Sequence, residues 1–206
     1  MDGYRAVGTR CAIDFRTLRL PLSEADALNI LERKGFRSVR VDPVELARAC
    51  VGKAAYRRGA RQAEAPTVFD CSGLTKWVYG CCGIWLPRRS IQQRSVGHEI
   101  SVAHIRAGDL VFTTGFMNYF DIDPADGVGH VGIATAEGTI VHAANRSTGI
   151  VETPLDRFVA DAFRGARRIV LEPEFVLTLE TPRGREVETA DDIRWIILQT
   201  LPKQSH

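Results

Sequence analysis

One cysteine and two histidines have the side-chain types and the surroundings that nucleophilic catalysis requires. Cys71 follows Asp70 at the predicted start of a helix, where unpaired backbone N–H groups and the helix dipole favour an anionic thiolate. The same N–H groups could stabilise the oxyanion that forms when a thiolate adds to a carbonyl carbon. A thiol nucleophile also needs a histidine base that is itself held in place, and His130 and His142 are the candidates.

The two histidines lie on either side of a predicted turn at Glu137-Gly138. If this hairpin is symmetric about residue 136, position 130 pairs with 142, 131 with 141 and 133 with 139. Both imidazoles then project from one face, with their Cβ atoms about 5 Å apart. We expect one imidazole to take the proton of the Cys71 thiol and the other to fix the tautomer of the first.

A helix and a sheet must bring these residues together, and the sequence pattern predicts both. Apolar residues at helical spacing from Leu74 to Cys82 predict a helix that begins at Cys71, is capped by Asp70 and ends at Gly83. Other helices are predicted at 23–34, from 43 to near Gly52, and at 191–201, the first two capped by Ser23 and Asp42. Strands are predicted at 11–20, 109–113, 130–135, 139–143 and 166–171, and a terminal hairpin at 175–181 and 185–189. A helix followed by antiparallel strands indicates an α+β fold.

Composition and charge exclude several classes of function. The chain has 206 residues, of which 45% are hydrophobic, and a net charge of +2, which gives no electrostatic basis for nucleic-acid binding. No apolar run reaches the roughly 20 residues of a membrane span. No signal peptide is visible, so we expect a cytoplasmic location or export by a non-classical route.

The cysteines do not indicate a disulfide framework or a metal site. Their number, five, is odd and their spacing is irregular, which argues against regular disulfide pairing. Neither Cys81-Cys82 nor the histidines have the spacing of a tetrahedral zinc site. We therefore expect no metal and no other cofactor.

Several short motifs resemble those of the NlpC family of bacterial cell-wall cysteine peptidases. In chain order they are Phe69-Asp-Cys-Ser-Gly-Leu74, Leu86-Pro-Arg88, Gly108-Asp-Leu-Val-Phe112, His130-Val-Gly-Ile133 and Val141-His-Ala143. The resemblance covers residues 43–170 and implies a papain-like α+β core with N-terminal helices packed on a central antiparallel sheet. It divides the chain into an N-terminal extension (1–41), an NlpC-type peptidase domain (42–171) and a C-terminal extension (172–206).

The resemblance also implies an activity and a set of site residues. The activity is hydrolysis of amide bonds in peptidoglycan stem peptides or muropeptides, through a thioacyl-enzyme, at the bond between γ-D-glutamate and a diamino acid. By position, the nucleophile, the general base and the third polar residue would be Cys71, His130 and His142, and the substrate would contact Tyr56, Asp70 and Ser72. Asp70 then has two compatible roles, as helix cap and as ligand of a free substrate amine.

Other interpretations of the same residues stay open. An amidase or acyltransferase could use the Cys–His–His site on a substrate other than peptidoglycan, or the chain could be a delivered effector or binding module. Arg88 and Arg89 could meet acidic groups of a substrate. Residues 114–129 could form a lid or an ordinary packed loop, and their aromatic and apolar residues are Phe116, Met117, Tyr119 and Phe120.

Overall fold

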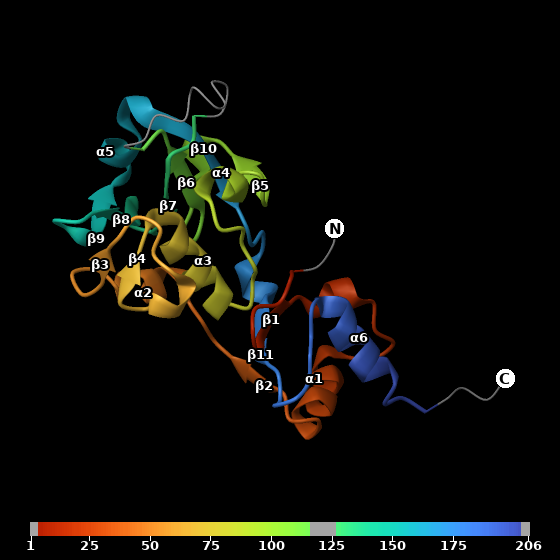
Figure 1. Cartoon of the computed structure of the whole chain (residues 1–206). Coiled ribbons are helices and arrows are strands. Elements are labelled where there is room, and N and C mark those ends of the chain that lie inside the picture. Colours follow the sequence, from red (N-terminus) through yellow and green to blue (C-terminus); the bar gives the residue numbers. More distant parts are fainter. Residues whose placement is uncertain (1–3, 116–126, 203–206) are drawn as a thin grey trace. The chain divides into compact units, whose positions relative to one another are not determined.

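The computed structural model of the chain describes residues 4–115 and 127–202 (Figure 1). These residues form two compact units. The core unit contains residues 42–79 and 86–171, and the terminal unit contains residues 80–85 with the segments before 42 and after 171. Each unit has its own sheet and its own buried residues. Within the described ranges, every helix is too short or too polar to cross a bilayer.

An antiparallel sheet forms the centre of the core unit. Its strand order is β5-β10-β6-β7-β8-β9, and each neighbouring pair is antiparallel. The strands are β5 (His98–Ile100), β6 (Leu110–Thr113), β7 (His130–Ala134), β8 (Thr139–Asn145), β9 (Gly149–Pro154) and β10 (Phe163–Arg168). A short parallel pair, β3 (Ala55–Tyr56) and β4 (Val68–Phe69), leads into the following helix. The central antiparallel sheet confirms the predicted α+β class.

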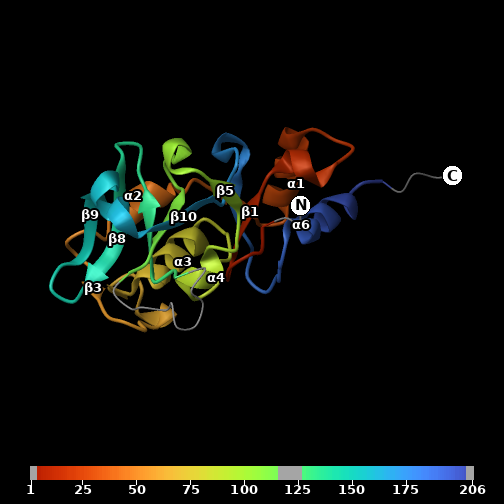
Figure 2. The same ribbon diagram turned by 90° about the horizontal axis from the view of Figure 1, so that it is seen from above.

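Helices lie beside this sheet, and two of them start at an aspartate cap. The helices are α2 (Pro43–Arg48), α3 (Cys71–Cys81), α4 (Ser90–Gln93) and α5 (Leu155–Val159). Asp42 Oδ1 accepts the backbone amide of Val44 at 2.7 Å, which caps α2 as predicted. Helix α2 contacts β7 and β8, and α2 and α3 lie beside the strands in both views (Figures 1 and 2). Helix α5 packs on an apolar face that includes Ala134 and Ile140.

The β7–β8 hairpin has a different register from the predicted one. Ile133 pairs with Val141 and Ala134 with Ile140, so the hairpin is symmetric about residue 137 and not 136. The shift arises at the turn, where the amide of Thr135 donates to the carbonyl of Thr139 at 2.9 Å. Because the pairing moves by two positions, the alternation of side chains is unchanged. His130 and His142 therefore still share a face, but they are diagonal neighbours and not directly opposite.

The terminal unit is built from both ends of the chain. Its antiparallel sheet has the order β1-β11-β2, with β1 (Arg10–Ile13), β2 (Arg37–Val39) and β11 (Leu177–Glu180). Helices α1 (Glu24–Arg33) and α6 (Ala190–Leu198) contact each other, and α6 contacts β1. Figure 1 shows these red and blue segments of the chain side by side. The two predicted extensions thus share one sheet.

Several predicted elements of the chain are wrong or misplaced. The strand predicted at 11–20 ends at Ile13, because Asp14 accepts the amide of Arg16 and turns the chain into a 3-10 helix. The predicted hairpin of 175–181 and 185–189 is wrong, since β11 pairs with β1 and β2 instead. Strands β5 and β9 are not predicted at all, and β10 begins at Phe163, ahead of the predicted start at residue 166.

Residues 80–85 are held among the strands of the terminal unit. The carbonyl of Gly83 accepts the amide of Ala12 at 3.0 Å, and the carbonyl of Cys82 accepts the hydroxyl of Thr178 at 2.8 Å. Gly83 has a φ of +79°, and a Cβ there would lie 2.6 Å from the amide nitrogen of Ala12. Both its backbone conformation and its surroundings therefore require glycine.

Replacing Gly83 with alanine should destabilise the terminal unit far more than replacing Gly184. The two glycines have φ of +79° and +78°, but a Cβ at Gly184 would meet no atom within 4 Å beyond its chain neighbours. Both variants carry the cost of a left-handed alanine, about 1 kcal/mol, and the backbone clash at Gly83 should raise the loss to about 3 kcal/mol or more. Urea denaturation of the two variants measures the difference, and equal losses would contradict the packing described.

Candidate active site

Cys71 is the first residue of α3. The carboxylate of Asp70 accepts the backbone amide of Gly73 at 2.7 Å, which confirms the predicted helix cap. The backbone amides of Ser72 and Val131 lie close enough to the Cys71 thiol to lower its pKa. Because Val131 directly follows His130, the start of α3 and the start of β7 meet at this thiol.

Burial dominates the acidity of the thiol. Removal from water raises the pKa of the Cys71 thiol to about 11, with a further increase from the Asp70 carboxylate, against smaller decreases from the two amides and Arg88. The helix start alone predicts a lowered pKa, and this expectation is wrong because burial outweighs it. The resting thiol is therefore protonated at neutral pH, and its nucleophilic form requires a base.

His130 and His142 form a hydrogen-bonded pair on one face of the β7–β8 hairpin. Nε2 of His130 lies 2.9 Å from Nδ1 of His142, and the two rings are close to perpendicular at 85°. On the far side, Nε2 of His142 lies 3.0 Å from Oγ1 of Thr153 on β9. The ring of Phe158, from α5, lies 5.6 Å from the His130 ring and 4.8 Å from the His142 ring, between centroids.

Both imidazoles are neutral at physiological pH. Burial lowers the pKa of His130 to about 3, with a smaller contribution from His142. Burial also lowers the pKa of His142 to about 4. A neutral imidazole has one N–H donor and one acceptor nitrogen. Since Nε2 of His130 faces His142, its Nδ1 is the ring nitrogen left for another partner.

Gly132 allows the two histidine-bearing strands to approach each other. Continuing the observed register places Gly132 opposite His142. A Cβ at Gly132 would lie 3.1 Å from the Cβ of His142 and 2.3 Å from Cγ2 of Ile140. A side chain there would push β8 away from β7, so the glycine of the His-Val-Gly-Ile motif is required by packing.

Arg88 binds the carboxylate of Asp70 with both of its terminal nitrogens. Nη1 donates to Oδ1 at 2.9 Å and Nη2 to Oδ2 at 2.5 Å. The same guanidinium donates to the hydroxyl of Ser72 at 3.1 Å and to the carbonyl of Ala60 at 2.8 Å. Oδ2 of Asp70 also accepts the amide of Gly59 at 2.9 Å. One ion pair thus joins the loop before α3, the start of α3 and the segment after it.

These contacts bear on the roles predicted for the site residues. The guanidinium of Arg88 donates to groups of its own chain, and contact of Arg88 or Arg89 with acidic substrate groups stays a prediction. A substrate amine that bound the Asp70 carboxylate would lie beside the guanidinium of Arg88. Tyr56 ends β3, and its backbone pairs with that of Phe69, two residues before Cys71. Substrate contacts by Tyr56, Asp70 and Ser72 stay predictions.

Sequence patterns miss several residues that support the site. Gln93 is fully buried; its Nε2 donates to the carbonyls of Ser72 at 3.0 Å and Pro87 at 2.9 Å, and its Oε1 accepts the hydroxyl of Thr75 at 2.8 Å. Thr153 and Phe158 are missed as well. Their partners lie on other elements of the chain, and only the β-branched residues Ile150, Val151 and Thr153 could have pointed to a strand there.

Other predictions for the site concern metals, disulfides and the 114–129 segment. Within the part of the chain that the structure describes, no three His, Cys, Asp or Glu side chains gather as they would around a metal ion. No disulfide joins the cysteines, all of which lie in described segments. Phe116, Met117, Tyr119 and Phe120, proposed above for a lid, lie outside the described residues.

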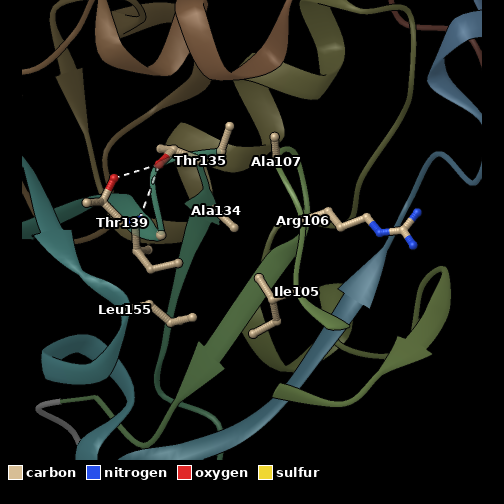
Figure 3. A pocket seen from close by; sticks show the side chains of 10 residues that line it. Ile105, Arg106, Ala107, Ala134, Thr135, Thr139 and Leu155 are labelled. Atoms are coloured by element: carbon tan, nitrogen blue, oxygen red, sulfur yellow. Dashed lines mark hydrogen bonds between the residues drawn. The ribbon is translucent and has the colours of Figure 1, made fainter. Parts of the chain in front are cut away.

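A separate cavity of about 310 Å³ lies at the turn end of β7 and β8 (Figure 3). Its lining includes Ile105, Ala134 and Leu155, and the hydroxyls of Thr135 and Thr139 bond each other at its edge, 2.6 Å apart. The guanidinium of Arg106 points away from it (Figure 3). None of its lining residues carries a thiol, an imidazole or a carboxylate, so it lacks the groups for acyl transfer that gather around Cys71.

Comparison with known proteins gives one family. A model described as the NlpC/P60 family matches residues 52–168. A probable endopeptidase of Corynebacterium glutamicum is 38% identical over 113 residues, which are 55% of this chain and 47% of that protein. A γ-D-glutamyl-L-lysine dipeptidyl-peptidase of Bacillus cereus is 34% identical over 103 residues, 48% of this chain and 28% of that protein. The chain thus spans about half or less of these relatives' length.

A solved structure supports the fold. The crystal structure of the NlpC/P60 domain of the peptidoglycan hydrolase SagA is 30% identical to this chain, with a TM-score of 0.50. The match covers 62% of this chain and 96% of that domain. This likeness confirms the predicted NlpC-type core.

Replacing Arg88 with alanine should destabilise the core unit, because it leaves the Asp70 carboxylate without its cation. Asp70 is only 7% exposed, and a buried group that loses its partner costs about 1–3 kcal/mol. Chemical denaturation measures the loss. Arg58→Ala, which removes an exposed arginine from the preceding loop, is the matched control and should change stability by less than about 0.5 kcal/mol. Equal effects of the two substitutions would contradict the role of the ion pair.

The free energy of unfolding should fall as the pH is lowered from 6.5 toward 5. Histidines in the unfolded chain take up protons near pH 6.5, whereas His130 and His142 stay neutral in the folded chain until about pH 3 and 4. The unfolded state therefore binds more protons in this window, so stability rises with pH, by at most about 1.4 kcal/mol per pH unit for each histidine. Urea denaturation as a function of pH measures the slope.

The variant His142→Gln should show a smaller slope, since it removes one of the two contributions. His104→Gln, at an exposed position, controls for the loss of a histidine as such. An unchanged slope in His142→Gln would mean that burial does not keep His142 neutral.

Proposed function

Because this chain belongs to the NlpC/P60 family, we propose that it is a cysteine peptidase that hydrolyses amide bonds in peptidoglycan stem peptides or muropeptides. The observation that carries this proposal is that the Cys71 thiol lies close to the backbone amide of Val131, the residue after His130, whose imidazole is hydrogen-bonded to that of His142. A thiol at a capped helix start and a neutral imidazole pair are the parts that acyl transfer through a thioester requires.

In the proposed mechanism, the sulfur of Cys71 adds to the carbonyl carbon of the scissile amide while Nδ1 of His130 takes the thiol proton. The amide of Ser72, which lies beside the thiol, stabilises the negative charge that develops on the carbonyl oxygen. His130 then gives its proton to the leaving amine nitrogen as the C–N bond breaks, which leaves a thioester on Cys71. Water, deprotonated by His130, hydrolyses the thioester and restores the thiol.

The proposed scissile bond joins γ-D-glutamate to a diamino acid. Support comes from the Bacillus cereus relative, which is named for a γ-D-glutamyl-L-lysine bond. Tyr56, Asp70 and Ser72 are the proposed substrate contacts; Asp70 and Ser72 flank Cys71 in the chain, and Tyr56 pairs with the residue before Asp70. Any substrate amine bound here shares the Asp70 carboxylate with Arg88.

Replacing Cys71 with alanine should abolish cleavage of a peptide that contains L-Ala-γ-D-Glu followed by a diamino acid. Loss of the nucleophile should reduce turnover by at least about a thousandfold. Mass spectrometry of the products measures release of the free diamino acid amine and the new glutamate carboxyl group. Cys81→Ala removes a partly buried thiol at the other end of α3 and should retain activity.

Two outcomes would contradict the proposal. Cleavage by Cys71→Ala at the wild-type rate would remove Cys71 from the mechanism. Stable wild-type protein that leaves muropeptides intact but transfers or hydrolyses another acyl group would make the chain an acyltransferase or amidase of different specificity.

A further inference from the structure

Thr153 stands at the end of a hydrogen-bond chain that starts at His130. The first hydrogen bond joins Nε2 of His130 to Nδ1 of His142 at 2.9 Å, and the second joins Nε2 of His142 to Oγ1 of Thr153 at 3.0 Å. In the β8–β9 ladder, Thr153 pairs with Ile140 and His142 pairs with Val151. Thr153 is therefore a diagonal neighbour of His142 on the same face of the sheet.

The donor–acceptor direction of one of these hydrogen bonds determines the direction of the other. A neutral imidazole carries a single N–H. If Thr153 accepts the Nε2–H of His142, then Nδ1 of His142 has a lone pair and accepts the Nε2–H of His130. Nδ1 of His130 is then unprotonated and can take the thiol proton. In the reverse direction Thr153 donates, and His130 carries its proton on Nδ1, where it cannot act as a base.

We propose that Thr153 is a positioning residue that accepts the hydrogen bond of His142 and so selects the tautomers in which His130 can act as a base. The effect on rate rests on the proposed function, whereas the tautomers themselves do not. Thr153 touches neither thiol nor substrate in this account, and acts only through His142.

Two features of the surroundings support this role. The ring of Phe158 lies against both imidazoles, which restricts rotation of the rings to an alternative pairing. A hydroxyl is also an uncharged acceptor, which suits a buried site. A carboxylate in its place would favour a charged imidazolium, whereas Thr153 can fix the tautomer of His142 and leave the ring neutral.

Nitrogen NMR of the ¹⁵N-labelled full chain tests this directly, because protonated and unprotonated ring nitrogens have distinct shifts. In the wild type we expect both His130 and His142 to carry their proton on Nε2. Thr153→Val should shift His142 toward the Nδ1–H tautomer and lower kcat for the muropeptide by about tenfold or more, with little change in KM. Thr153→Ser should restore both the tautomer and the rate.

Thr148→Val, in the exposed turn of the same β8–β9 hairpin, is the control and should alter neither readout. A wild-type spectrum with the proton of His142 on Nδ1 would overturn the proposal, even if Thr153→Val failed to fold. So would a folded Thr153→Val variant with unchanged tautomers and kcat. Failure of the proposed function is a separate result, since it would appear as cleavage that survives in Cys71→Ala whatever the tautomers are.

Discussion

The ion pair between Asp70 and Arg88 is the interaction on which the rest of the site depends. The Asp70 carboxylate caps α3 through Gly73, accepts the amide of Gly59 and binds both terminal nitrogens of Arg88. The bidentate geometry requires the planar fork of arginine, which a lysine ammonium does not offer. Because Cys71 is the next residue, contacts that hold Asp70 in place also hold the proposed nucleophile at the helix start.

The same site is built to be uncharged at rest. Burial raises the pKa of the Cys71 thiol and lowers that of His130 and His142. A thiol and two neutral imidazoles are the least costly forms in such surroundings, since desolvation penalises every charged form. In the proposed mechanism, charge separation occurs when the thiol attacks, and the hydrogen bonds from His130 through His142 to Thr153 would orient the imidazole that receives the proton.

The features that sequence alone predicts here are local ones. The caps at Asp42 and Asp70 and the helices they start are predictable, because a cap and its apolar stripe lie within a dozen residues. Side chains alternate between the two faces of a strand, so an error of two positions in register leaves a residue on the same face. The shared face of His130 and His142 is therefore also predictable.

The features that sequence patterns miss depend on contacts between separate elements of the chain. Arg88 reaches Asp70 across 18 residues, and Thr153 reaches His142 from β9, a strand that the patterns do not predict. Strands β1 and β11 pair across most of the chain. Sequence patterns miss the direction of the Cys71 pKa shift for the same reason. The burial that raises this pKa arises only when the helix and the sheet pack together.

The most direct test of the central claim is to trap the acyl-enzyme. The wild-type chain is mixed with a γ-D-glutamyl peptide, quenched in acid within the first turnover and digested for mass spectrometry. The account predicts a thioester adduct of the N-terminal part of the substrate on the peptide that contains Cys71, and on none of the peptides that contain the other four cysteines. Product release with no adduct at Cys71, or with the adduct on another residue, would contradict it.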